Sequence, residues 1–266
     1  MAPDTLSLAN KTAIITGSGR ENGIGAAIAH ALARNGANVV INYVSPSSAS
    51  RAAKVEATLK PLGVKVLVVQ ADVSTPQGAA KLVKETLRGF GVDKIDILVN
   101  NAGDGTGQGK LLLDLSPEEV HQAFAVNTFS TVFATQAVAP YMPNGGRIVN
   151  VGSIVSRLST LPGVSIYGAS KAAQEFLTGA LATELGSSKG ITVNTVAPGP
   201  TATDASSWYP DNELRADAMV KMAGASKADK MAGSADEIAD AVLLVVSEQA
   251  RWITGQYIAA SGGMTD

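Results

Sequence analysis

The sequence contains no cysteine, and this absence excludes several kinds of site at once. Without thiols the chain can form no disulfide, carry no thiolate nucleophile and build no zinc–thiolate site. The absence also fits a reducing compartment, where proteins are not stabilised by disulfides. The only histidines, His30 and His121, have no metal-ligand partner at a useful spacing. We therefore predict that both histidines are structural and that the protein binds no metal.

An excess of positive charge and long apolar runs are also missing. Lys and Arg number 21 against 23 Asp and Glu, a net charge of −2, and the basic residues form no cluster. The chain therefore lacks the electrostatic signature of proteins that bind nucleic acid or anionic membranes. No apolar run approaches the roughly 18 residues of a membrane-spanning helix. The opening MAPDTLSLANK has no basic region followed by an apolar core. We expect a soluble, cytoplasmic protein with no nucleic-acid or membrane partner.

Apolar residues, in contrast, make up 45% of the chain and alternate between two patterns. Short β-branched runs are separated by longer alanine-rich stretches that can hold crossover helices. The runs cover residues 12–16, 37–43, 64–70, 96–100, 146–151, 191–196 and 256–260. Ser116 and Ser234, each followed three residues later by Glu, predict two helix starts. The alternation predicts an α/β fold with one doubly wound, seven-stranded parallel sheet and helices on both faces. A split into two domains near 103–109 is the alternative, although the strand rhythm continues on both sides.

Glycines cluster directly after the first of these runs, in the stretch TGSGRENGIG. At a strand-to-helix turn, missing side chains let a pyrophosphate approach backbone N–H groups and the positive end of the helix dipole. Glycine-rich turns also occur without ligands, but this position in an alternating pattern favours dinucleotide binding. The predicted cofactor turn comprises Gly17, Ser18, Gly23, Ile24 and Gly25.

The end of the second run indicates the type of dinucleotide. Asn42 and Tyr43 stand where an acidic residue would bind the ribose 2′-hydroxyl of NAD(H). A 2′-phosphate meets no carboxylate there, and Arg20 and Ser45 are placed to contact it. Glu21 is discordant, because its charge opposes a phosphate. The pattern favours NADP(H), with NAD(H) as the alternative.

The stretch YGASK places Tyr167 four residues before Lys171, with only small residues between them. On a helix these positions lie on one face, about one turn apart. A nearby ammonium favours the ionised phenol, so we expect Lys171 to lower the pKa of Tyr167 toward neutrality. A tyrosine tuned in this way can exchange protons with an alcohol or ketone. Such a pair also arises by chance on a helix surface, so the rest of the chain must support this interpretation.

Motifs elsewhere give that support, because together they resemble those of the short-chain dehydrogenases/reductases. The matching stretches are TG…GIG at 16–25, ADV at 71–73, NNAG at 100–103, Asn127, Ser153, YGASK at 167–171 and PGPTAT at 198–203. The resemblance runs from about residue 10 to 264. It implies one Rossmann-type domain spanning 1–266 with a seven-stranded parallel sheet, assembled as a homotetramer or homodimer. One departure bears on cofactor preference: Gly17 and Gly23 enclose five residues, where the family usually has three.

The resemblance also implies roles for individual residues. Tyr167 matches the proton donor or acceptor, and Lys171 the residue that lowers its pKa and binds the nicotinamide ribose. Ser153 matches the group that holds the substrate oxygen, and Asn127 the residue that positions a water in a proton relay. Further cofactor contacts match Asp72, Val73, Asn100, Ala102, Gly103, Pro198, Gly199 and Thr203. Asp72 has an alternative role in capping the helix that follows it.

These residues predict an enzyme that transfers a hydride between NADP(H) and a ketone or secondary alcohol, with Tyr167 as general acid or base. Two alternatives stay open: a dinucleotide-binding sensor or scaffold without turnover, and non-redox chemistry, such as an elimination, on the same fold. Residues 204–226 fit neither the strand nor the long-helix rhythm. In an open sheet this connection overhangs the crevice, so we predict a substrate lid there. Trp208, Tyr209 and Met219 would contact a fairly large apolar or aromatic carbonyl compound; an ordinary surface excursion is the alternative.

Overall fold

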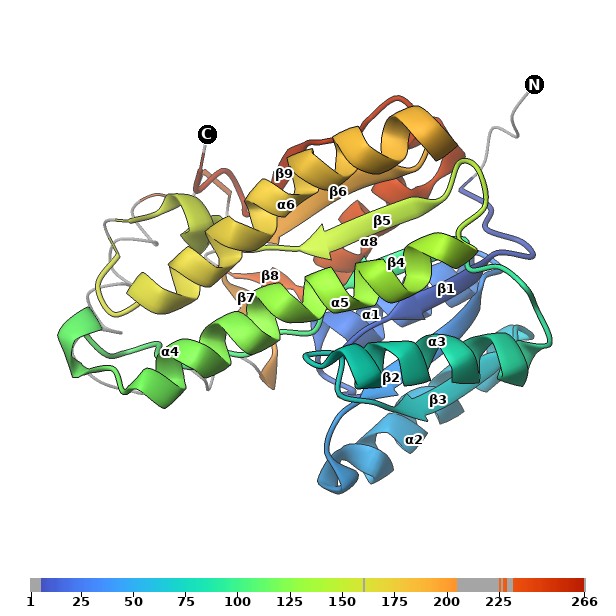
Figure 1. Cartoon of the computed structure of the whole chain (residues 1–266), viewed down its shortest axis with the longest axis horizontal. Coiled ribbons are helices and arrows are strands. Elements are labelled where there is room, and N and C mark those ends of the chain that lie inside the picture. Colours follow the sequence, from blue (N-terminus) through green and yellow to red (C-terminus); the bar gives the residue numbers. More distant parts are fainter. Residues whose placement is uncertain (1–5, 160, 205–224, 226, 229–231, 266) are drawn as a thin grey trace.

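Seven parallel strands form the central sheet of the computed structural model, which describes residues 6–159, 161–204, 225, 227–228 and 232–265 (Figure 1). They are β1 (Thr12–Ile15), β2 (Asn38–Tyr43), β3 (Val66–Gln70), β4 (Ile97–Asn100), β5 (Arg147–Val151), β6 (Thr192–Pro198) and β9 (Tyr257–Ala260). Their order across the sheet is β3-β2-β1-β4-β5-β6-β9. The predicted seven-stranded sheet is confirmed, with each strand end within two residues of the expected position. A short parallel pair, β7 (Thr201–Ala202) with β8 (Gly233–Ser234), forms a separate sheet.

Helices cover both faces of the sheet, because each parallel connection must cross over it. One face is covered by α1 (Ile24–Arg34), α2 (Ala49–Leu59) and α8 (Ala235–Val246), and the other by α3 (Pro76–Phe90), α5 (Ser130–Val138) and α6 (Ser165–Lys189) (Figure 1). The sheet thus separates two apolar cores, with Ile15 in one and Ile14 in the other. Every residue of β1, β4, β5 and β6 is buried, which explains why these runs are apolar on both faces.

The strand order reverses between β1 and β4, and this reversal positions the site. The register places Ile14 opposite both Val40 and Leu98, so neighbouring strands end at nearly the same level. The segments that leave β1, β4, β5 and β6 therefore emerge at one edge of the sheet. They carry the glycine-rich turn, the NNAG loop, Ser153 and the PGPTAT turn, which are far apart in the sequence.

Local sequence signals set the ends of several helices. Ser116 caps α4 (Pro117–Phe124) and Ser234 caps α8, and each forms the predicted capping box with the Glu three residues on. A π-helical turn (Ala125–Phe129) connects α4 directly to α5, and Figure 1 shows the two as one continuous rod. Such turns often occur at functional sites, and this one contains Asn127.

The connection after β7 is only partly described. Of the predicted lid at 204–226, the structure describes Asp204 and Ala225, so Trp208, Tyr209 and Met219 lie outside the described residues. In the part that is described, no helix combines the length and apolar character needed to cross a bilayer. Nor do three or more His, Asp or Glu residues gather there in a way that could hold a metal ion.

Candidate active site

A cleft of about 520 Å³ opens at the carboxyl edge of the sheet. Its walls are the glycine-rich turn, the loop after β4, the segment after β5, the start of α6 and the turn after β6. The cleft brings together most of the residues singled out in the sequence. They are Gly17, Arg20, Gly23, Ile24, Gly25, Asn42, Tyr43, Ser45, Ala102, Gly103, Asn127, Ser153, Tyr167, Lys171, Pro198, Gly199 and Thr203. Their placement is observed, whereas their contacts to a ligand stay predictions.

Two glycines let the turn after β1 lie against the loop after β4. Gly17 has a left-handed backbone (φ 64°), and a Cβ there would come within 2.8 Å of the Ala102 Cα. A Cβ on Gly25 would collide with the Asn101 amide nitrogen. Gly23 is the N-cap residue of α1, and no side chain caps this helix. The N-terminus of α1 is therefore suited to an anionic group, as the pyrophosphate of a dinucleotide requires.

Asn42 and Ser18 shape this turn from inside the protein. Asn42 is fully buried; its Oδ1 accepts a hydrogen bond from the Gly17 N–H (3.0 Å), and its Nδ2 donates to the Ala71 carbonyl oxygen (3.0 Å). Ser18 is also fully buried, and its hydroxyl donates to the Ile15 carbonyl oxygen (2.7 Å). Both side chains thus stabilise the shape of the turn. Sequence spacing predicted cofactor contacts at these positions but could not reveal this supporting role.

A wall beside the glycine-rich turn is formed by Arg20, Tyr43, Val44, Ser45 and Ser48. In the same turn, the Glu21 carboxylate accepts a hydrogen bond from Arg51 Nε (2.6 Å), and Arg51 also pairs with Asp204. The hydrogen bond from Arg51 lowers the pKa of Glu21 to about 2, so Glu21 is ionised. Its charge is balanced by Arg51, which it shares with Asp204, together with Lys54, whose Nζ lies 3.5 Å from the Glu21 carboxylate. Glu21 was the discordant residue for a 2′-phosphate, and its ion pair removes that objection. Arg51 lies 30 residues away on α2, so no local spacing marked it.

Asp72, Val73 and Asn100 do not line the cleft in the described part of the chain. The Asp72 carboxylate accepts hydrogen bonds from the N–H (3.0 Å) and hydroxyl (2.6 Å) of Ser74, just before α3. The N-cap of α3 is Thr75, whose hydroxyl accepts from the Gly78 N–H (3.1 Å), so the alternative role of Asp72 as the cap is wrong. Val73 belongs to an apolar core. Asn100 is buried in the sheet, where its Nδ2 donates to a side chain of β5 (2.9 Å). The NNAG loop instead presents Asn101 to the cleft, and only the fold distinguishes the two asparagines.

Ser153, Tyr167 and Lys171 meet at one wall of the cleft. Ser153 follows β5 and caps a short 3-10 helix (Ile154–Arg157). Tyr167 and Lys171 both lie on α6, as the four-residue spacing predicts. The Ser153 side chain is near enough to the Tyr167 hydroxyl to offset part of the rise that burial causes in its pKa. This wall therefore offers two hydroxyl groups and one ammonium to a ligand.

Asn127 is fully buried and ties the loop after NNAG to α6. Its Oδ1 accepts a hydrogen bond from the Asp104 N–H (3.0 Å), while its Nδ2 donates to the Asp104 carbonyl oxygen (3.1 Å) and to Ser170 Oγ (3.2 Å). Gly103 makes room for this contact, because a Cβ there would lie 2.9 Å from Asn127 Oδ1 and 3.3 Å from Lys171 Nζ. The observed role of Asn127 is thus to join two elements, and its role in water binding stays a prediction.

Burial shifts the pKa values of Tyr167 and Lys171 in opposite directions. It raises the pKa of Tyr167, and the negative charge of Asp104 adds to that effect. It also lowers the pKa of Lys171 to about 8. The prediction that Lys171 lowers the pKa of Tyr167 is therefore wrong for this structure. The Lys171 ammonium donates instead to the Val151 carbonyl oxygen (2.9 Å) and to Gln174 Oε1 (3.4 Å). Helical spacing places Tyr167 and Lys171 on one face of α6, but it does not determine which groups the end of the long lysine side chain contacts.

Gln174 and Asp104 are two residues at or near this site that the motifs did not indicate. Gln174 is fully buried on α6, where its Nε2 donates to Thr131 Oγ1 (2.7 Å) and its Oε1 accepts from Lys171 Nζ (3.4 Å). Asp104 lines the cleft, and its carboxylate accepts hydrogen bonds from the Thr106 N–H (3.0 Å) and Gln122 Nε2 (3.2 Å). Two features of the sequence could have indicated them: Gln174 lies three residues after Lys171, and Asp104 directly follows NNAG.

Known proteins resemble this chain over nearly its whole length. The family model described as Enoyl-(Acyl carrier protein) reductase matches residues 17–265. An uncharacterized oxidoreductase of Methylorubrum extorquens is 38% identical over 259 residues, which cover 97% of this chain and 98% of that protein. Versicolorin reductase 1 of Aspergillus parasiticus is 36% identical over 267 residues, which cover 98% of this chain and 98% of that protein.

Solved structures extend the similarity to three dimensions. A short chain dehydrogenase from Burkholderia cenocepacia in complex with NADP superposes with a TM-score of 0.84 at 38% identity, covering 97% of this chain and 98% of that one. A blue fluorescent protein from a metagenomic library, in complex with NADPH, gives a TM-score of 0.86 at 33% identity, covering 98% of this chain and 100% of that one. These proteins therefore resemble this chain in both sequence and fold.

Proposed function

The chain belongs to the short-chain dehydrogenases/reductases, and from this premise we propose that it transfers a hydride between NADP(H) and a ketone or secondary alcohol. The observation that carries the proposal is the meeting of Ser153, Tyr167 and Lys171 at one wall of a cleft that also contains the N-terminus of α1. The helix N-terminus suits a pyrophosphate. The catalytic wall suits a carbonyl oxygen that gains charge.

Hydride transfer to a carbonyl carbon leaves a negative charge on the oxygen. Hydrogen-bond donors at the wall can stabilise that charge. The bound cofactor supplies the hydride. Ser153 holds the oxygen by a hydrogen bond, and Tyr167, kept protonated by its raised pKa, donates the proton. The Lys171 ammonium, charged below its pKa of about 8, lines the same wall and is placed to bind the hydroxyls of the nicotinamide ribose. In the direction of alcohol oxidation Tyr167 accepts the proton.

The choice of NADP(H) rests on the charges beside the glycine-rich turn. Arg20, Tyr43 and Ser45 line the cleft there, and Arg51 balances the charge of Glu21. A 2′-phosphate would gain a charge-assisted contact with Arg20. The relatives crystallised with NADP or NADPH support the same assignment. The residues that would hold the pyrophosphate and the nicotinamide are Gly17, Gly23, Ile24, Gly25, Pro198, Gly199 and Thr203.

The substrate end of the cleft favours a neutral, largely apolar ketone. Ile154, Val155, Leu161 and Val164 contribute its apolar lining. Asp104 adds a carboxylate that accepts two hydrogen bonds but forms no ion pair with any residue the structure describes. Its charge therefore disfavours an anionic substrate. The segment 204–226 is proposed to cover such a ketone as a lid.

We also propose that residues 1–266 form one catalytic domain that assembles as a homotetramer or homodimer in the cytoplasm. Two aromatic side chains support the assembly: Phe129 is 41% exposed and Phe176, on α6, is 79% exposed. Their helical segments pack against each other, so the two rings lie on neighbouring elements. Large exposed apolar side chains on adjacent elements mark surfaces for protein contact.

A panel of neutral ketones, β-ketoesters and polycyclic quinones, assayed with NADPH and with NADH, tests the proposed function. We expect NADPH oxidation with at least one apolar ketone and slower oxidation of NADH. We also expect the free acid of a good β-ketoester to be a poor substrate, because Asp104 repels it. Binding of NADPH without turnover of any carbonyl would favour the sensor or scaffold alternative.

A further inference from the structure

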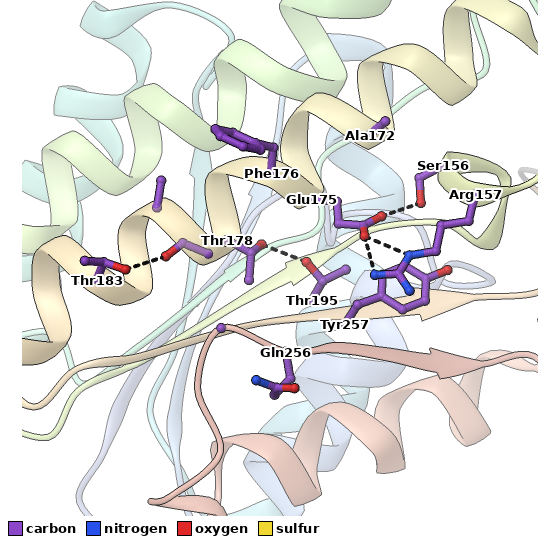
Figure 2. A pocket seen from close by; sticks show the side chains of 13 residues that line it. Ser156, Arg157, Ala172, Glu175, Phe176, Thr178, Thr183, Thr195, Gln256 and Tyr257 are labelled. Atoms are coloured by element: carbon purple, nitrogen blue, oxygen red, sulfur yellow. Dashed lines mark hydrogen bonds and ion pairs between the residues drawn. The ribbon is translucent and has the colours of Figure 1, made fainter. Parts of the chain in front are cut away.

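A second cavity, of about 570 Å³, lies among α6, β9 and the 3-10 helix that follows Ser153 (Figure 2). Its lining includes Ser156, Arg157, Glu175 and Tyr257. The mechanism above uses none of these four side chains. Ser156 and Arg157, however, belong to the 3-10 helix that Ser153 caps. The wall of this cavity therefore includes the segment that carries the catalytic serine.

The Glu175 carboxylate joins this segment to α6 through three hydrogen bonds. Its Oε1 accepts from Arg157 Nε (2.8 Å) and Nη2 (2.6 Å), and its Oε2 accepts from the Ser156 hydroxyl (2.7 Å). Hydrogen bonds to an ionised group are roughly twice as strong as neutral ones. The Arg157 guanidinium also lies 3.7 Å from the centre of the Tyr257 ring, so it bridges α6 and β9 (Figure 2).

Ser156 connects Glu175 to Ser153, because its hydroxyl contacts both residues. The Ser156 Oγ lies 2.8 Å from the Ser153 carbonyl oxygen and 2.7 Å from Glu175 Oε2, and the Ser156 N–H donates to the same carbonyl (3.1 Å). The Ser153 side-chain oxygen accepts a hydrogen bond from the Val155 N–H (3.2 Å). The catalytic hydroxyl therefore sits on a short turn whose other end is fixed by Glu175.

The same helix carries the other catalytic groups. Tyr167, Lys171 and Glu175 follow one another at four-residue intervals on α6, so they lie along one side of it. Tyr167 and Lys171 line the cleft, and Glu175 holds the turn that carries Ser153. Attaching this turn to α6 fixes the position of Ser153 relative to Tyr167, and both residues line the same cleft.

We propose that Glu175, acting through Ser156 and Arg157, is a positioning residue that holds the Ser153 hydroxyl in reach of Tyr167. This inference rests on the proposed hydride transfer and extends it to side chains of the second cavity. A displacement of about 1 Å at a reacting group can lower a rate by about a hundredfold. Loss of Glu175 should therefore lower kcat and leave NADPH binding intact, because the glycine-rich turn belongs to other elements.

A double-mutant cycle separates positioning from general stabilisation. Glu175→Ala should lower kcat for a neutral ketone by roughly tenfold to a hundredfold, with an unchanged Kd for NADPH. Glu175→Gln keeps the shape and an acceptor oxygen, so it should lose less. In a Ser153→Ala background, where residual turnover no longer uses that hydroxyl, Glu175→Ala should change kcat by less than about twofold. Glu184→Ala is the matched control, because Glu184 is exposed on the same helix, and it should change neither value.

Full kcat in Glu175→Ala, or an equal loss with and without the Ser153 hydroxyl, would overturn the inference. If Glu175→Ala does not fold, Ser156→Ala breaks the same link with a smaller change and should lower kcat only when Ser153 is present. A loss that is independent of Ser153 would again overturn the inference. Failure of the unsubstituted protein to oxidise NADPH with any ketone would overturn the proposed function, and this inference with it.

Discussion

At the wall where Ser153, Tyr167 and Lys171 meet, the charge of each group follows from its surroundings. Burial and the nearby Asp104 raise the pKa of Tyr167, so its proton is available for donation at neutral pH. Burial lowers the pKa of Lys171 to about 8, so the ammonium is the group that titrates nearest to physiological pH. The site is thus set for reduction of a carbonyl at neutral pH.

Tyr167→Phe tests the proton donor, because it removes the hydroxyl and keeps the ring. We expect carbonyl reduction to fall by roughly a hundredfold or more, the usual contribution of a positioned acid. Binding of NADPH, measured by titration calorimetry, should stay nearly unchanged. A variant that keeps most of its turnover would show that Tyr167 is not the acid.

The pH dependence of reduction tests the Lys171 assignment. Because the pKa of Lys171 is lowered to about 8, the ammonium loses its proton as the pH rises through that value. The positive charge that we propose binds the nicotinamide ribose then disappears, so kcat should fall on the alkaline side. Lys171→Arg keeps its charge to higher pH and should move this fall upward, even if its rate is lower. A profile that stays level well above pH 8 in the unsubstituted protein would contradict the assignment.

Arg20→Ala tests how the 2′-phosphate is recognised. Loss of a charge-assisted contact costs about 1.5–3 kcal/mol, which corresponds to about a ten- to hundredfold weaker Kd for NADPH. The Kd for NADH should change much less, because NADH has no 2′-phosphate. Arg88→Ala is the control, since Arg88 is exposed on α3 and does not line the cleft. Equal losses for the two cofactors would show that Arg20 does not recognise this phosphate.

At the scale of elements, local patterns were sufficient to place strands and helix starts. The runs that became β1, β4, β5 and β6 are buried at every position, which favours apolar residues on both faces, whereas β3 and β9 at the sheet edges are less buried. The capping boxes at Ser116 and Ser234 appeared as predicted because their hydrogen bonds join residues close in sequence. Contacts between elements were not predictable in this way. The pairing of Glu21 with Arg51 and the direction of the Lys171 side chain depend on how helices are placed in space.

The capping box of α8 offers a test at this scale. Ser234 accepts a hydrogen bond from the Glu237 N–H (3.2 Å), and its own N–H donates to the Glu237 carboxylate (2.7 Å). Ser234→Ala should lower the free energy of unfolding by about 1 kcal/mol, measured by urea denaturation. Ser234→Asp keeps an acceptor oxygen and should retain most of the stability. An unchanged midpoint in Ser234→Ala would mean that the box does not stabilise α8.

For the whole molecule, the alternation of short apolar runs with alanine-rich stretches predicted the fold class. The fold in turn explains how the site forms. A parallel sheet that winds in both directions from β1 brings four carboxyl ends to one edge, where motifs separated by long stretches of chain meet. Most of the residues that the motifs singled out line the cleft, since nearly all of them lie near a strand end or on α6. Ser18, Asp72, Val73 and Asn100 were the exceptions. Their positions relative to the cleft depend on the local course of the backbone, which spacing alone does not specify.

Transfer of deuterium tests the central claim most directly. NADPH carrying deuterium at both C4 positions would be incubated with the protein and a ketone identified in the panel, and the product alcohol analysed by mass spectrometry. The account predicts one deuterium on the carbinol carbon, and almost no product with the Tyr167→Phe variant. An alcohol without deuterium, or a labelled alcohol formed equally fast by Tyr167→Phe, would contradict it.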